Sequence, residues 1–116
     1  MSDPTIFSPL RGVAMTLLDA ASALNASGFT IAIPDSFKYH KLYIIGSAGV
    51  ASGAVQPESA DASDYAGTWA QIGGGPITVV ASTELQVDFV GVYQFIRVRI
   101  STVLAGGTVT VKYEGS

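Results

Sequence analysis

The sequence has no cysteine, and it has a single histidine among its 116 residues. Disulfides, thiolate nucleophiles and thiolate metal ligands are therefore excluded. The histidine, His40, cannot build a catalytic triad alone, because no nucleophile and orienting acid accompany it at a recognisable spacing. It stands between Tyr39 and Lys41, and we expect it at the surface or in a loop. The sequence thus predicts no catalytic residues and no enzyme activity.

Charged residues are also scarce. They make up 13 % of the chain, while hydrophobic residues make up 48 %; an average soluble domain has roughly 25 % charged residues. The net charge of −3 offers no general basic surface, so we expect no nucleic-acid partner. In a small monomer with so few charges, little electrostatic repulsion keeps the apolar patches of neighbouring molecules apart. We therefore expect the surface to be covered in use, by copies of the chain in a dimer or trimer or by a larger assembly.

Long hydrophobic runs are missing too. No run approaches the roughly 18 apolar residues of a membrane span, and the N-terminus lacks the basic and apolar regions of a signal peptide. We expect no membrane partner and a chain made in the cytoplasm. The length fits one domain, at residues 13–116. Residues 1–12 contain Pro4, Pro9 and Gly12 without periodicity, which predicts an extended N-terminal arm.

What the chain does have is alternation of apolar and polar residues. Residues 84–101 and 106–115 alternate almost without interruption, which predicts a two-stranded β-sheet with one buried and one exposed face. Val98, Ile100, Val109 and Val111 should share the buried face. The other predicted strands cover residues 13–23, 29–33, 41–46, 53–58, 68–72 and 77–80. About 8–9 strands without a helix predict an all-β fold, an antiparallel β-sandwich that is jelly-roll-like.

Three further predictions concern strand pairing. A turn at residues 25–28 joins the first two strands into a hairpin. The run at residues 41–46 lacks clean alternation, as expected of a central strand that is covered on both faces. Pro57 has no N–H for a ladder hydrogen bond, so we expect residues 53–58 to form an edge strand or a bulge.

Two clusters offer binding chemistry. Glu58, Asp61 and Asp64 provide the oxygen ligands that Ca²⁺ prefers, but the EF-hand spacing is absent. We favour a solvated acidic loop, with no metal ion and no cofactor. The aromatic residues Trp69, Tyr65, Tyr39 and Tyr43 suit a sugar-stacking platform. For Trp69 we favour the alternative, a core position at one end of the sandwich.

The order of six motifs along the chain carries a resemblance. They are TLLDAA at residues 16–21, KLYIIGS at 41–47, VQPES at 55–59, GTWAQI at 67–72, FIRVRI at 95–100 and GGTVTV at 106–111. In this order, over about residues 13–115, the chain resembles small β-sandwich virion proteins of tailed bacteriophages. The resemblance implies a non-enzymatic capsid decoration (cement) protein or a head-tail accessory protein. Such a protein is made in the host cytoplasm, lies on the capsid surface of the virion in many copies and binds the major capsid protein.

A carbohydrate-binding or receptor-binding β-sandwich module of a phage tail is the alternative function. Under the decoration hypothesis, six residues are candidates for partner binding. They are Ile6, Phe7, Pro9 and Leu10 in the arm, and Arg97 and Arg99 on a predicted strand. The arm residues are apolar and fit a docking site on a neighbouring subunit, whereas the two arginines can form a local basic strip with Lys112 on one sheet. For this strip we favour the alternative, solvated charges on the outer face of a strand.

Overall fold

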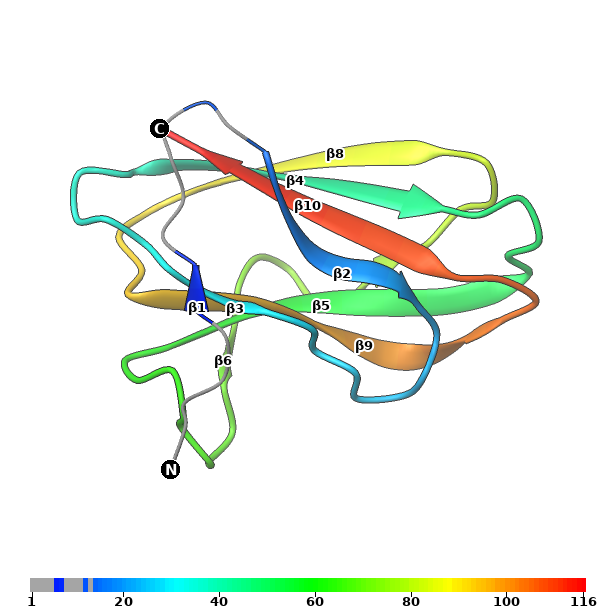
Figure 1. The fold of residues 1–116 in the computed structure, drawn as a ribbon, viewed down its shortest axis with the longest axis horizontal. Coiled ribbons are helices and arrows are strands. Elements are labelled where there is room, and N and C mark those ends of the chain that lie inside the picture. Colours follow the sequence, from blue (N-terminus) through cyan, green and yellow to red (C-terminus); the bar gives the residue numbers. More distant parts are fainter. Residues whose placement is uncertain (1–5, 8–11, 13) are drawn as a thin grey trace.

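The computed structural model describes residues 6–7, of which it describes the backbone alone, residue 12 and residues 14–116. The described residues form ten strands, arranged in two sheets that pack face to face (Figure 1). The strands are β1 (Ile6–Phe7), β2 (Met15–Ala21), β3 (Thr30–Ala32), β4 (Tyr39–Gly46), β5 (Ser52–Ala60), β6 (Ala70–Gln71), β7 (Ile77–Thr78), β8 (Glu84–Val90), β9 (Phe95–Ala105) and β10 (Val109–Gly115). None of the described residues belongs to a helix that is long and apolar enough to cross a membrane.

The strand order is that of a jelly roll. One sheet has four strands in the order β2-β10-β4-β8, and the other has six, in the order β1-β3-β9-β5-β6 with β7 also paired to β5. Strands from the two halves of the chain pair antiparallel in reverse order: β2 with β10, β3 with β9, β4 with β8, and β5 with β6 and β7. This is a long antiparallel ribbon wound over itself. The predicted all-β antiparallel sandwich is confirmed.

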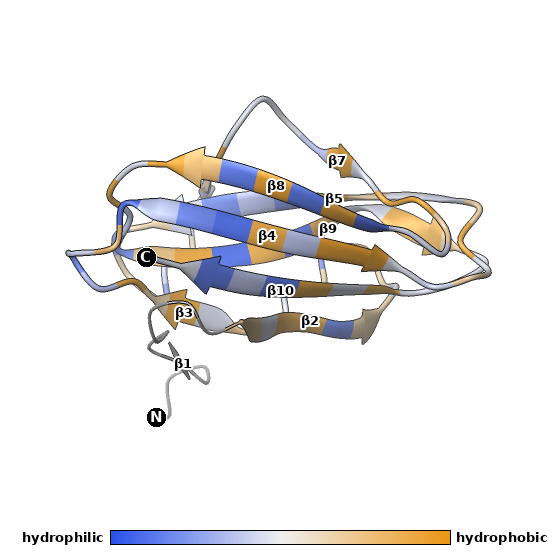
Figure 2. Cartoon of the chain, turned by 90° about the horizontal axis from the view of Figure 1, so that it is seen from above, coloured by the Kyte–Doolittle hydropathy of each residue, from blue (hydrophilic) through white to orange (hydrophobic). Residues whose placement is uncertain are grey.

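The core lies between the two sheets. Along β4, β8 and β10 every second side chain points inward, so hydropathy alternates along these strands (Figure 2). The fully buried side chains come from both sheets and include Leu17, Ile44, Val98, Ile100 and Val111. Burying each of these side chains stabilises the fold by about 1.5–3 kcal/mol. The predicted inward orientation of Val98, Ile100 and Val111 is therefore confirmed.

Two predictions of strand pairing are wrong. Residues 84–101 form not one strand but two, β8 and β9, which lie in different sheets. The chain crosses between the sheets after Gly91, which has a φ of +146°, and the Gly91 N–H donates a hydrogen bond to the Lys38 carbonyl. Strand β10 pairs with β2 and β4 and not with either half of this segment. Alternation fixes which face of a strand is buried, but it does not name the partner strand.

The predicted hairpin is wrong for the same reason. Its two strands correspond to β2 and β3, which belong to opposite sheets. The connection folds under β2, where Gly28 has a φ of +56° and lies so close to Leu17 that a Cβ atom would stand 2.0 Å from the Leu17 carbonyl oxygen. A turn is present two residues earlier than predicted, at residues 23–26, where the Ala26 N–H donates to the Ala23 carbonyl. The connection carries the chain from one layer of the sandwich to the other.

The predictions for β4 and β5 are partly reversed. Strand β4 is central, as predicted, but its burial alternates, so it is covered on one face alone. Strand β5 is the one that is buried on both faces over most of its length. It lies between β9 and the short strands β6 and β7, so it is not an edge strand. The β5–β9 register shifts between Ser52 and Val55, so the strand has an irregularity of the predicted kind, but not at Pro57. The Pro57 carbonyl accepts a hydrogen bond from Ile72, just beyond β6, so the proline nitrogen faces that short strand and no bond to β9 is lost.

Candidate binding surfaces

His40 is buried, with 3 % of its surface exposed, so the prediction of a surface or loop position is wrong. Its Nδ1 lies 2.6 Å from the Tyr113 hydroxyl oxygen, and its Nε2 lies 2.9 Å from the Gly91 carbonyl oxygen. A neutral imidazole satisfies both contacts, because Nε2–H donates to the carbonyl while Nδ1 accepts from the hydroxyl. The ring stacks on Phe89 with a centroid separation of 4.9 Å and meets the edge of Tyr93 at 5.5 Å.

These contacts give His40 a role in holding the fold together. Burial lowers the pKa of His40, and its hydrogen bond with Gly91 opposes the shift in part. Burial also raises the pKa of the Tyr113 hydroxyl, which makes that group a poor nucleophile at neutral pH. His40 joins β4 to β10 and to the turn after β8. Its position was readable from the sequence, because it stands in register with the inward side chains of Leu42 and Ile44.

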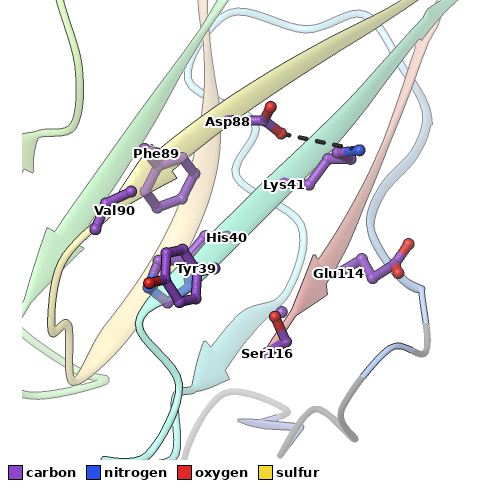
Figure 3. Close-up of a pocket in the computed structure, with 9 residues that line it drawn as sticks. Tyr39, His40, Lys41, Asp88, Phe89, Val90, Glu114 and Ser116 are labelled. Carbon is purple, nitrogen blue, oxygen red and sulfur yellow. Dashed lines mark ion pairs between the residues drawn. The ribbon is translucent and has the colours of Figure 1, made fainter.

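A shallow hollow of about 340 Å³ opens on the outer face of the four-stranded sheet. It lies over β4, between β8 on one side and β10 with the C-terminus on the other (Figure 3). The outward side chains around it are Tyr39, Lys41, Asp88, Val90, Glu114 and Ser116. Lys41 and Asp88 form an exposed ion pair of 4.0 Å, which contributes little to stability. The hollow combines an aromatic ring and an apolar side chain with charges of both signs, as a recognition surface does.

Exposed apolar side chains gather beside this hollow. Tyr39 is 65 % exposed and Val90 is 68 % exposed, and these two residues are direct partners in the β4–β8 ladder. Val92, two residues further along the chain, is 63 % exposed. A group of exposed apolar side chains on a protein with few charges marks a contact surface. We call these three residues the Tyr39 patch.

The predicted basic strip is wrong in one member, because Lys112 lies on β10, in the other sheet from Arg97 and Arg99. The remaining pair of arginines is partly neutralised. Glu58 on β5 is buried, and its two carboxylate oxygens accept hydrogen bonds from Nε of Arg97 and Nε of Arg99, at 3.0 and 3.1 Å. Arg99 also donates to Asn25, at 3.1 Å. Both arginines lie on the outer face of β9, and each side chain is about a quarter exposed. Two guanidinium groups share one carboxylate, so a net positive charge remains there. Their role in partner binding stays a prediction.

Trp69 is buried, as predicted for a core residue, but it packs outside the main core. Its ring lies 4.1 Å from the guanidinium carbon of Arg97, and its Nε1–H donates to the Tyr65 carbonyl at 2.9 Å. Because the cation covers the indole, Trp69 does not offer a free stacking surface. Tyr39 and Tyr65 remain exposed.

The acidic cluster does not come together as a loop. Glu58 belongs to β5 and is held by the two arginines, whereas Asp61 and Asp64 follow the end of that strand. Within residues 14–116 and the other described positions, no three acidic or histidine side chains are grouped to hold a metal ion.

The structure describes only part of the predicted N-terminal arm. The backbone of β1 pairs parallel with β3 of the same chain, with Ile6 opposite Thr30 and Phe7 opposite Ile31. The side chains of these two arm residues, and all of Pro9 and Leu10, lie outside the described residues. Docking of the arm on a neighbouring subunit therefore stays a prediction. No protein-family profile matches the chain, and no curated protein is significantly similar to it in sequence.

Proposed function

We propose that this chain is a non-enzymatic structural protein of a tailed-phage particle. In this role it decorates the capsid surface, binds the major capsid protein, associates with itself and stabilises the head shell. It does so without a cofactor, a nucleic-acid partner or a membrane. The assignment to a phage particle is suggested by the order of sequence motifs, which resembles that of small virion sandwiches.

The observation that supports a binding role best is the Tyr39 patch beside the hollow. Tyr39 and Val90 sit on paired strands of a sandwich with an apolar core, so their side chains are held in place before a partner arrives, and Val92 lies in the connection that follows β8. A rigid surface loses little conformational entropy on binding. A decoration protein works through many weak contacts spread over a shell, and a small apolar patch repeated on each copy suits that task.

The test has two stages. Quantitative mass spectrometry of purified particles compares copies of this chain with copies of the major capsid protein. Copy numbers of the same order support decoration, a handful of copies moves the chain to the tail, and no copies would reject the particle role. The second stage measures binding of the purified chain and its variants to phage heads that lack it, which tests whether the Tyr39 patch is the contact surface.

Val90→Ser should weaken head binding, because it removes an exposed apolar contact without opening a cavity. Val103→Ser is the matched control, since Val103 is a strand valine of similar exposure on the other sheet. Equal head binding by the two variants would exclude the patch as the contact surface.

The exposed Tyr39 supports a second candidate, a carbohydrate-binding or receptor-binding module of a tail. A tyrosine ring at the border of a shallow hollow can stack on a sugar ring. A glycan array separates the two functions. Glycan binding that Tyr39→Ser abolishes, without a change in melting temperature, would favour the tail module.

A further inference from the structure

Strand β8 forms an exposed edge of the four-stranded sheet. Among the described strands it pairs with β4 alone, over seven residues in continuous register. The other edges are blunted: β1, β6 and β7 have two residues each, and β2 has register shifts against β10 and a residue at positive φ, Ala20. Proteins usually protect a long edge with charged side chains, lysine above all, with proline or with a bulge. The charges of β8, Glu84 and Asp88, both point to the outer face of the sheet and not inward. Strand β8, with the sequence ELQVDFV, has no lysine, no proline and no bulge.

The backbone groups that β8 presents at this edge can be identified. The Gly91 N–H donates to the Lys38 carbonyl at 3.0 Å, and the Gly46 N–H donates to the Thr83 carbonyl at 3.1 Å, one bond at each end of the β4–β8 ladder. In an antiparallel ladder, residues alternate between bonding to the neighbour and pointing away from it. Odd-numbered residues of β8 therefore bond to β4. The N–H and C=O groups of Glu84, Gln86, Asp88 and Val90 point to the free edge.

The inward side chains of β8 are incompletely covered. Leu85, Val87 and Phe89 pack against the core but remain partly exposed, whereas Leu42 and Ile44 on the adjacent strand are fully buried. The opposite sheet ends at this border in the two-residue strand β7, as Figure 2 shows. The edge thus offers an apolar strip and backbone groups that no described strand pairs.

We propose that β8 pairs antiparallel with β8 of a second copy, about a two-fold axis at Val87. The pairing joins the two four-stranded sheets into one continuous sheet. Gln86 then lies opposite Asp88 of the second copy, and Leu85 lies opposite Phe89. The four outward-bonding residues of each copy meet one another, so the edge hydrogen bonds are satisfied.

Charge selects this register. A register shifted so that Gln86 lies on the axis would place Glu84 directly opposite Asp88, and a register with Asp88 on the axis would place that residue opposite itself. Like charges directly opposite each other destabilise a strand pair. Of these three registers, the one centred on Val87 is free of such a pair and also uses the full length of the strand.

This dimer rests on the proposed function, which includes self-association, and it identifies the edge of β8 as the surface through which two copies associate. One pair of edge strands makes a small interface, so the dimer forms in a concentration-dependent way. Sedimentation equilibrium of the full chain should show a mass that rises from 12.0 kDa toward twice that value. A single mass of 12.0 kDa up to millimolar concentration would overturn the proposal.

Two substitutions at one position test the register. Gln86→Lys places a cation opposite Asp88 of the second copy, and Gln86→Glu places an anion there. Because the two-fold axis makes this pair twice, the dimer dissociation constant should change by about 2- to 30-fold, falling for lysine and rising for glutamate. Equal dissociation constants, or the opposite order, would overturn the Val87-centred register.

A proline variant tests the edge itself. Gln86→Pro removes an N–H that points away from β4, so the β4–β8 ladder keeps its bonds while the edge loses a donor. Gln86→Ala is the matched control with that N–H retained. The proline variant should be monomeric and the alanine variant dimeric, with melting curves reporting the fold of both. A folded proline variant that still dimerises would show that another surface is used.

Cross-linking fixes the axis, and the chain has no cysteine of its own to interfere. Val87→Cys places two thiols opposite each other in a non-hydrogen-bonded pair, where side chains approach closely enough for a disulfide. Leu85→Cys, on the same face of the strand, leaves the two thiols offset by roughly 13 Å along the strands. Air oxidation should link the first variant and not the second; equal linking of both would reject the axis. If Gln86→Pro abolishes the dimer but not head binding, the function proposal stands without the dimer.

Discussion

Replacement of Tyr113 by phenylalanine should destabilise the fold by about 1–3 kcal/mol, the cost of a buried polar atom that loses its partner. The Tyr113 side chain is fully buried, and its hydroxyl donates to Nδ1 of His40 over 2.6 Å. The variant keeps the aromatic ring, so no sizeable cavity opens. What it leaves is an imidazole nitrogen without a donor, next to the rings of Phe89 and Tyr93.

Urea unfolding at pH 7.5, followed by Trp69 fluorescence and far-UV circular dichroism, measures this effect. Tyr43→Phe is the control, because the Tyr43 hydroxyl bonds Glu114 on the outer face of the sheet, where water can replace it. The control should change the free energy of unfolding by no more than about 0.5 kcal/mol.

A double-mutant cycle isolates the pair. His40→Leu alone leaves the Tyr113 hydroxyl buried without an acceptor, whereas the double variant removes both polar partners. The double variant should therefore be more stable than the sum of the single effects predicts, by about 1 kcal/mol or more. Additive single effects, or a Tyr113→Phe variant as stable as the Tyr43→Phe control, would refute the reasoning.

Three further predictions concern the same fold. Burial lowers the pKa of His40 below its ordinary value of 6.5, so the unfolded chain takes up the proton at a higher pH than the folded chain. The free energy of unfolding should therefore be greatest above pH 6.5 and fall as the pH drops below that value. His40→Leu should remove this pH dependence when urea unfolding is repeated over a series of pH values. Ile100→Ala should lower the free energy of unfolding by about 2–5 kcal/mol, while the exposed Val103→Ala should change it by no more than about 0.5 kcal/mol in the same assay. Glu58→Gln should cost about 1–3 kcal/mol, because two partly buried guanidinium groups lose their shared carboxylate, and unchanged chemical denaturation would argue against this ion-pair cluster.

The fold class was accessible from the sequence because alternation is a local property. Inward side chains such as Val98 and Ile100 follow from the period of two alone, and they are buried as predicted. The same rule, applied to β4, would have placed His40 inside. The expectation of a surface histidine weighed residue type above position, which is why it failed.

The binding surface was less accessible. The Tyr39 patch joins residues of β4, of the end of β8 and of the connection after β8, which are far apart in the sequence. Its exposure depends on the outer face of the four-stranded sheet, which no other described strand covers. The pairing of Glu58 with two arginines likewise arises from the β5–β9 ladder, although each of these residues was singled out beforehand. Sequence patterns gave the chemistry of these residues but not their neighbours.

By itself, the sequence determined an all-β sandwich without cysteine chemistry and the inward faces of the clearly alternating strands β9 and β10, because residue type and a period of two act over a few neighbouring residues. The tertiary structure decided which strands pair, that β5 and not β4 is covered on both faces, and that β8 is left as the open edge. These outcomes depend on contacts between distant parts of the chain, such as His40 with Tyr113. Such contacts form only when the whole jelly roll closes, and a local pattern is compatible with more than one way of closing it.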